Sequence, residues 1–182
     1  INYFLSIAYY GFNLTGTRFV ASNRESQSRL QYIYIVVNST RLFLCFVSSI
    51  LIVGLVFSIP SFREYATLYV LFIPMIWGGA LLSDWMYQGI ERMKYIAILN
   101  TGIRLIFLIA VFAFIHSQED LWVYPFSLSL AYIVSAIVSH RLLRRLLGLK
   151  FRLCRFKHIS QRLRADFPIF INQFVPTLYN NT

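Results

Sequence analysis

The sequence contains little charge and very little acid. Of its 182 residues 13% are charged and only 7 are Asp or Glu, whereas about a quarter of the residues of a soluble domain are charged. Hydrophobic residues make up 58% of the chain, and its mean hydropathy is +0.61. These values argue against a water-soluble globule and indicate a chain that lies largely in lipid.

Cysteines and catalytic motifs are also scarce. The two cysteines, Cys45 and Cys154, lie in an apolar run and in a basic segment, and neither has a partner at metal-ligand spacing. This excludes a disulfide framework. The sequence has no Gly-rich phosphate loop, no His-rich metal spacing and no nucleophile-and-base motif. We therefore predict a protein that is not an enzyme and that uses no metal and no cofactor.

Long uncharged runs predict membrane-spanning helices. A helix needs roughly 20 apolar residues to cross a hydrocarbon core of about 30 Å. The predicted spans are 1–17, 42–60, 65–83, 95–115 and 121–139, and a sixth starts at 166 and continues to 182. Because backbone groups in lipid must be paired within each segment, the predicted class is an all-α membrane protein, a polytopic helical bundle. Since both terminal runs stop abruptly, we expect a piece of a longer protein.

The basic residues predict the orientation of these spans. Of the 17 Lys and Arg residues, 15 fall in the segments 18–41, 89–94 and 141–164, which alternate with two segments poor in basic residues. Under the positive-inside rule the three basic segments are cytoplasmic.

The last basic segment has a pattern of its own. Residues 141–165 are predicted to form a basic amphipathic cytoplasmic loop, because apolar side chains between Leu149 and Leu163 fall within one arc at helical spacing. Such a helix lies on the inner leaflet, where its basic residues attract anionic phospholipids. Nucleic acid is a poor alternative, since the segment lies between two spans and contains no binding module.

Two charged residues lie inside or close to the predicted spans. Arg104 follows Tyr95 by nine residues, which places it roughly 13 Å into its span, and Asp84 lies near the cytoplasmic end of the preceding one. A charge at such a depth faces a partner or a water-filled cavity, because insertion alone costs on the order of 2.5–3.5 kcal/mol. Two interpretations stay open: an ion pair between Asp84 and Arg104, or an Arg104 that faces a central cavity and binds an anionic group such as phosphate.

Small residues predict where helices pack closely. One row at a spacing of four and one cluster have this character: Ser127, Ala131, Ser135 and Ser139, and Gly78, Gly79, Ala80 and Ser83. We interpret both as surfaces of close helix contact.

Four short runs resemble a known family. The runs are YGFNLTGTR at 10–18, DWMYQGIERMK at 84–94, DFPIF at 166–170 and LYNN at 178–181. They resemble bacterial polysaccharide biosynthesis proteins of the O-antigen flippase type, which belong to the multidrug/oligosaccharidyl-lipid/polysaccharide exporter superfamily. The second run is the most specific, and the resemblance extends over nearly the whole chain.

The resemblance implies a two-lobe exporter of the bacterial inner membrane, of which this chain forms part of the N-terminal lobe. Such proteins flip an undecaprenyl-pyrophosphate-linked oligosaccharide from the cytoplasmic to the periplasmic leaflet during surface polysaccharide synthesis, by alternating access through a cationic lumen. It implies a lipid-linked oligosaccharide substrate and, as partners, a polysaccharide polymerase and glycosyltransferases of the same pathway. The residues that match the lumen are Arg104, Arg18, Asp84, Gln88, Asn13 and Glu91.

Two other functions stay open at this stage. A drug or small-molecule exporter of the same superfamily would share the fold and the rocking mechanism. A membrane-embedded glycan transferase is a weaker alternative, because it needs a large periplasmic loop or clustered acids and histidines, whereas the predicted outside segments 61–64 and 117–120 are short.

Overall fold

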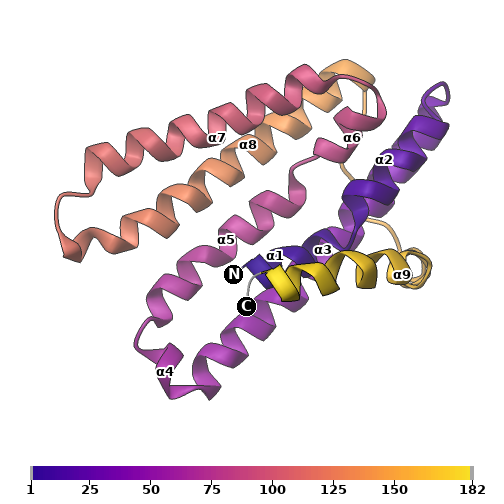
Figure 1. Cartoon of the computed structure of the whole chain (residues 1–182). Coiled ribbons are helices and arrows are strands. Elements are labelled where there is room, and N and C mark those ends of the chain that lie inside the picture. Colours follow the sequence, from indigo (N-terminus) through magenta and orange to yellow (C-terminus); the bar gives the residue numbers. More distant parts are fainter. Residues whose placement is uncertain (1, 181–182) are drawn as a thin grey trace.

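The structure, a computed structural model, describes residues 2–180, without the side chains of 118, 119 and 177–180. Within these residues every regular element is helical, which confirms the all-α class. The elements are α1 (Asn2–Tyr9), α2 (Phe12–Ser22), α3 (Gln27–Ser58), α4 (Pro60–Arg63), α5 (Ala66–Leu81), α6 (Asp84–Gly89), α7 (Met93–Phe114), the 3-10 helix η1 (Gln118–Trp122), α8 (Val123–Leu147) and α9 (Phe156–Asn180). Figure 1 shows the long helices as a bundle, with the α7–α8 hairpin on one side and α9 on the other.

Four stretches are long and apolar enough to cross a membrane. They are Gln27–Ser58, Ala66–Gly89, Met93–Phe114 and Asp120–Leu147. In order, they correspond to the four complete spans expected from the sequence.

Two of the apolar stretches are interrupted helices. The expected span 1–17 is divided by Tyr10 and Gly11, which separate α1 from α2 and whose φ angles of 45° and 74° are left-handed and cannot continue a right-handed helix. The stretch Ala66–Gly89 is divided into α5 and α6 at Leu82, whose backbone is extended, near the end of the expected span 65–83. Both interruptions lie in or beside the runs that carry the family resemblance.

Helix α3 is longer than the expected span. It contains 32 residues and begins at Gln27, so it is about 48 Å long, well above the thickness of the hydrocarbon core. The segment 18–41 is therefore not a loop. It contains the end of α2, a short turn and the first half of α3, and this change moves Arg41 from the cytoplasm into the bundle.

The bundle is held together by close contacts between small residues. A Cβ atom on Gly78 of α5 would lie 2.6 Å from the backbone carbon of Tyr132 on α8 and 2.7 Å from the nitrogen of Ile133. The small-residue row of α8 is buried along its whole length, from Ser127 to Ser139. The interpretation of both small-residue surfaces as close helix contacts is confirmed.

One face of α7 is uncovered. Only 11% of its most apolar stretch is buried, because within the described residues α7 packs mainly against α8 and the short α6. Its open face carries large apolar side chains, namely Ile98, Leu105, Ile109 and Phe112. Arg104 of α7 is also exposed.

The basic segment after α8 differs from the expected amphipathic helix. Helix α8 continues to Leu147 and is ended by Gly148 in a left-handed conformation, with φ 63°. Residues 149–155 are not helical, because α3 side chains bind their backbone: Gln31 Oε1 accepts from the Lys150 N–H at 2.8 Å, and Ser39 Oγ accepts from the Cys154 N–H at 3.0 Å. The segment is thus fastened to α3.

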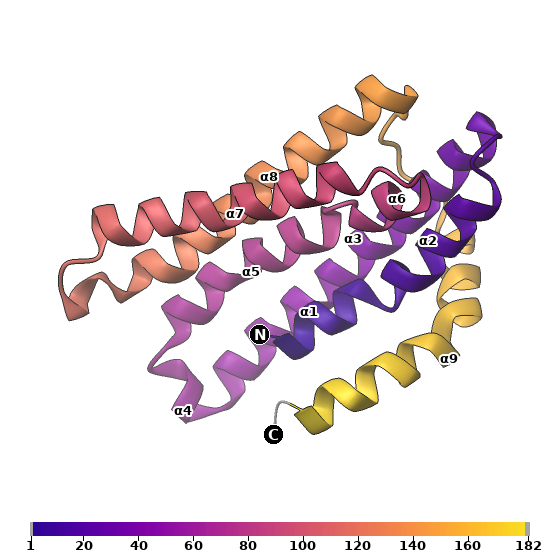
Figure 2. The same cartoon turned by 45° about the horizontal axis from the view of Figure 1, so that its top comes forward.

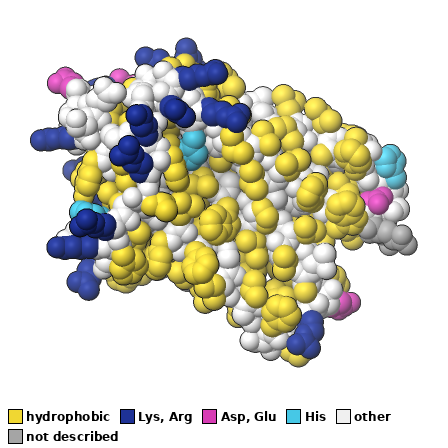
Figure 3. All heavy atoms as spheres, turned by 180° about the vertical axis from the view of Figure 1, so that it is seen from behind, with side chains coloured by type: hydrophobic (Ala, Val, Ile, Leu, Met, Phe, Trp, Pro, Cys, Tyr) yellow, Lys and Arg dark blue, Asp and Glu magenta, His cyan; other side chains and the backbone are white. Residues whose placement is uncertain are grey.

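Basic side chains gather at one end of the bundle. Figure 3 shows Lys and Arg at the end where α2, α8 and α9 meet, and a mostly hydrophobic surface over the remainder of that face. The three basic segments therefore lie at the same end, as the alternation in the sequence predicts.

A cysteine-labelling experiment tests the orientation. Cys154 is partly exposed at the basic end, whereas Cys45 is buried. In spheroplasts, we expect Cys154 to react with an impermeant maleimide only after permeabilisation, because the predicted orientation places it on the cytoplasmic side. The matched variant, Glu64→Cys with Cys154→Ser, should react before permeabilisation. Labelling in the opposite order would contradict the orientation.

Candidate functional site

A buried arginine lies at the interruption between α5 and α6. Arg41 of α3 has an exposed fraction of 0%. Its Nη1 donates to the carbonyl oxygens of Ala80 at 2.9 Å and Leu82 at 3.2 Å. Because α5 ends at Leu81, these carbonyls have no following helical turn to pair with. The guanidinium therefore supplies the donors that the interrupted helix lacks.

The same guanidinium connects these carbonyls to α2 and to a set of aromatic rings. Its Nη2 donates to Asn13 Oδ1 at 2.7 Å. The guanidinium carbon lies 5.7 to 5.9 Å from three ring centroids, those of Tyr9, Phe12 and Trp85. Rings at this distance stabilise a cation that has lost its water. Arg41 thus joins both interrupted helices.

The runs that carry the family resemblance meet around α2, although they are far apart in the sequence. A Cβ atom on Gly16 would lie 2.8 Å from the Trp85 ring, and one on Gly89 would lie 2.4 Å from Val20 Cγ1, so α2 and α6 are in direct contact. Helix α9 lies along the other side of α2 (Figure 2).

Helix α9 is attached to the interruption between α1 and α2. The ring of Tyr10 stacks on that of Phe170 with centroids 4.4 Å apart, and its hydroxyl donates to the Leu163 carbonyl at 3.2 Å. Nearby, Arg162 pairs with the buried Asp166 at 2.5 Å. These contacts bring the runs 10–18, 84–94 and 166–170 into one assembly.

Three of the site residues predicted from the sequence belong to this assembly. Asn13 binds Arg41, as described above. Gln88 Oε1 accepts a hydrogen bond from the Thr17 hydroxyl at 3.2 Å. Asp84, the first residue of α6, is partly buried, interacts electrostatically with Arg41 and has Asn100 of α7 as a hydrogen-bond partner.

The other three predicted residues take no part in these contacts. Arg104 is exposed on α7, and within the described residues it forms no ion pair. Of the two open interpretations, the ion pair with Asp84 is therefore not formed there. Arg18 is exposed on α2. Glu91 lies in the turn after α6 with φ 60° and pairs with Arg24 at 2.7 Å, with 70% of its side chain exposed.

The sequence analysis missed Arg41, but the sequence contained a signal for it. Arg41 is the single charged residue between Leu30 and Phe62, a stretch long enough to form one continuous helix. The predicted span began just after the arginine, because a charge was taken as the end of the apolar run. Counting from the polar residues at 26–28 would have placed Arg41 inside the helix.

These features define a class of protein: a multi-pass helical membrane protein whose polar interior is organised at interrupted helices. The sequence matches the polysaccharide biosynthesis protein family over residues 1–182, and the chain belongs to that family. The chain is therefore part of a multi-pass protein of the bacterial inner membrane.

Two similar proteins carry the name "Putative O-antigen transporter". The one from Escherichia coli (strain K12) is 23% identical over 178 residues, which is 98% of this chain. The one from Shigella dysenteriae is 29% identical over 175 residues, which is 95% of this chain. The chain spans 43% of the length of each. No solved structure matches the chain.

Proposed function

We propose that the protein containing this chain flips an undecaprenyl-pyrophosphate-linked oligosaccharide from the cytoplasmic to the periplasmic leaflet. The polysaccharide biosynthesis family and the transporter names of the two similar proteins support an export role. The transport requires no covalent chemistry from the protein. A polysaccharide polymerase and glycosyltransferases of the same pathway are its proposed partners.

The position of Arg104 is the observation that carries this proposal. Arg104 lies ten residues before the end of α7 at Phe114, so it is about 15 Å from that end and near the middle of the membrane. It is exposed, and no described acid neutralises it. Because an unpaired cation at this depth is unfavourable in lipid, its surroundings in the whole protein must be water, protein or an anionic ligand.

The proposed role of Arg104 follows from its chemistry. Its planar guanidinium group can donate hydrogen bonds to two oxygens of a diphosphate at once, and it stays positively charged at any physiological pH. In the proposed cycle the diphosphate and sugar enter the lumen beside α7, the polyprenyl tail stays in lipid, and rocking of two lobes changes the side of access. Arg18 is proposed as a second lumen cation nearer to the cytoplasm, and Asn13, Asp84 and Gln88 as polar residues behind the lumen wall.

Substitutions of Arg104 in the full-length protein test this role. We expect Arg104→Ala and Arg104→Glu to reduce surface polysaccharide at least about tenfold, since each removes a charge-assisted diphosphate contact worth about 1.5–3 kcal/mol. Arg104→Lys should retain part of the output, because it keeps the charge without the fork. The matched control, Arg63→Ala, removes an arginine outside the membrane and should behave as wild type. Normal output from all Arg104 variants would contradict the lumen role.

A drug or small-molecule exporter is the second candidate, because it would share the fold. A deletion strain separates the two. A flippase predicts accumulation of complete lipid-linked oligosaccharide on the cytoplasmic side. A drug exporter predicts drug sensitivity without that accumulation, and a glycan transferase predicts an incomplete oligosaccharide.

A further inference from the structure

A pocket at the cytoplasmic end of the bundle has no role in the proposed transport. It encloses about 380 Å³ between the end of α8, the start of the segment 148–155 and the first half of α3. We call it the basic pocket, and its lining residues are Tyr34, His140, Arg141, Arg144, Leu149, Lys150, Phe151 and Arg152.

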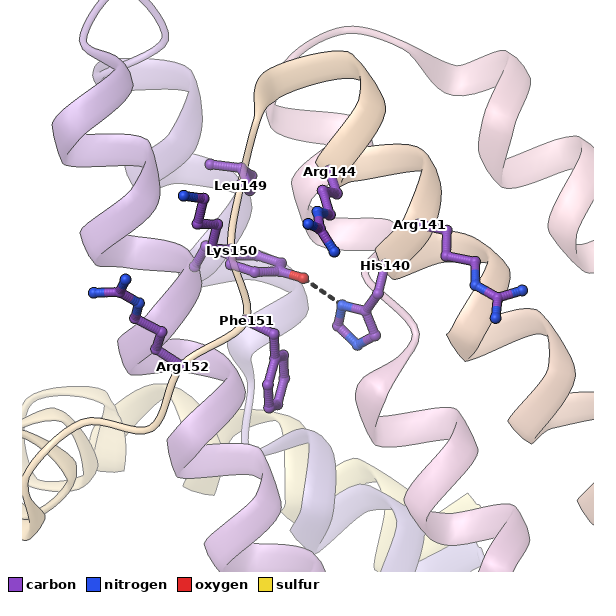
Figure 4. Close-up of a pocket in the computed structure, with 8 residues that line it drawn as sticks. His140, Arg141, Arg144, Leu149, Lys150, Phe151 and Arg152 are labelled. Carbon is purple, nitrogen blue, oxygen red and sulfur yellow. Dashed lines mark hydrogen bonds between the residues drawn. The ribbon is translucent and has the colours of Figure 1, made fainter.

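The basic pocket has a firm base. Tyr34, with an exposed fraction of 1%, is hydrogen-bonded to the His140 ring, and Phe151 packs edge-on against both rings. In Figure 4 the His140 ring and the Arg144 side chain extend toward the same space, while the Arg141 and Arg152 side chains lie on opposite sides of it and extend outward.

The backbone around the pocket is held in place by two glutamines of α3. Gln27 donates to the Leu147 carbonyl at 3.0 Å, and Gln31 donates to the Lys150 carbonyl at 2.7 Å while it accepts from the N–H of the same residue. The cationic segment is therefore fastened at both ends of the pocket. Its charges are brought together by the fold and do not depend on a flexible loop.

The charge of the basic pocket is not compensated. Four of the lining residues are cations, namely Arg141, Arg144, Lys150 and Arg152, and none is an acid. The ion pairs of the described residues lie elsewhere, at Arg24 with Glu91 and at Arg162 with Asp166. With four cations and no acid among its lining residues, the basic pocket attracts anions.

The pocket lies at the level of lipid headgroups. Arg141 follows Leu121 by 20 residues, which corresponds to about 30 Å of helix, the thickness of the hydrocarbon core. Phe151 is 45% exposed beside the cations and offers an apolar surface next to them. Cations beside an exposed ring at this depth suit an amphipathic anion.

We propose that the basic pocket binds the phosphate group of an inner-leaflet lipid and prefers a phosphomonoester or diphosphate headgroup to a phosphodiester. A phosphomonoester carries up to two charges near pH 7 and three acceptor oxygens, whereas a phosphodiester carries one charge. Arginine forks bind such oxygens in pairs. The site is independent of the flipping cycle and remains if another substrate is transported.

Native mass spectrometry of the purified full-length protein tests the site. We expect phosphatidic acid to bind about tenfold more tightly than phosphatidylglycerol. The double variant Arg144→Gln/Arg152→Gln should weaken phosphatidic acid binding about tenfold or more, because charge-assisted hydrogen bonds are lost. The matched control, Arg155→Gln/Lys157→Gln, removes the same charge from exposed positions of the same region outside the pocket and should change binding less than about twofold.

Three outcomes would overturn the proposal. Equal weakening by both double variants would indicate general surface attraction, and no weakening by either would exclude the pocket. If inorganic pyrophosphate binds with the same affinity as phosphatidic acid and displaces it, the ligand is a soluble phosphate compound and not a lipid. The thermal unfolding of each lipid-free variant is compared with that of wild type. If the double variant is unstable, the single variant Arg152→Gln, at an exposed position, replaces it.

Discussion

Replacing Arg41 by leucine is expected to lower the free energy of unfolding by about 3–5 kcal/mol, the usual result of removing one member of a buried charged network. The substitution leaves the Ala80 and Leu82 carbonyls and the Asn13 amide oxygen without their donor. Each would be a buried polar group that loses its hydrogen bond. Thermal unfolding of the full-length protein in detergent measures the effect.

Two variants make this prediction specific. Arg41→Lys keeps the charge but lacks the planar guanidinium group that reaches the Ala80, Leu82 and Asn13 oxygens together. The stability of this variant should therefore lie between those of wild type and Arg41→Leu. Arg104→Leu is the matched control, because it removes the same group from an exposed position of α7. It should leave the unfolding temperature nearly unchanged while reducing transport. If Arg41→Leu unfolds at the same temperature as Arg104→Leu, the buried arginine does not hold the two interrupted helices together.

The second large effect is expected at Gly78. Gly78→Ala should destabilise the protein by about 1–3 kcal/mol, the usual effect of overpacking. The new methyl group would lie 2.6 Å and 2.7 Å from backbone atoms of α8, which cannot rotate away as a side chain can. The two most extensively packed helices, α5 and α8, would have to move apart.

The matched control for Gly78 is another helical glycine. A Cβ on Gly54 of α3 meets no atom within 4 Å. Gly54→Ala should therefore be neutral, or stabilising by up to about 1 kcal/mol, because alanine favours the helix. Parallel unfolding curves for the two variants measure the difference. Equal stabilities would show that the contact between α5 and α8 is looser than described.

The sequence predicted the parts of the fold that depend on the composition of long segments. Apolar runs were sufficient for the four complete crossings, because a membrane helix needs many consecutive apolar residues whatever its partners are. The basic residues were sufficient to predict that the three basic segments lie at one end of the bundle. The close packing at Gly78 and along the Ser127–Ser139 row was also predictable, since small residues at helical spacing favour close contact.

The remaining features depend on contacts that one segment makes with another. The left-handed turn at Tyr10 and Gly11 is stabilised by α9, more than 150 residues away in the sequence. The segment 149–163 has helical spacing, but α3 side chains bind the backbone of its first part, 149–155, which is not helical. Arg41 was assigned to the cytoplasm because its charge marked the end of the apolar run. The local pattern does not reveal that its acceptors lie on α2 and at the end of α5.

The central claim is that the protein moves a lipid-linked oligosaccharide and that Arg104 contacts its diphosphate. Proteoliposomes that contain the full-length protein and a labelled lipid-linked oligosaccharide test it directly, by the fraction of substrate that becomes accessible to a reagent on the opposite side. The account predicts transfer by wild type and by Arg63→Ala, and transfer at least about tenfold slower by Arg104→Ala, since a charge-assisted contact is lost. No transfer by wild type, or equal transfer by wild type and Arg104→Ala, would contradict it.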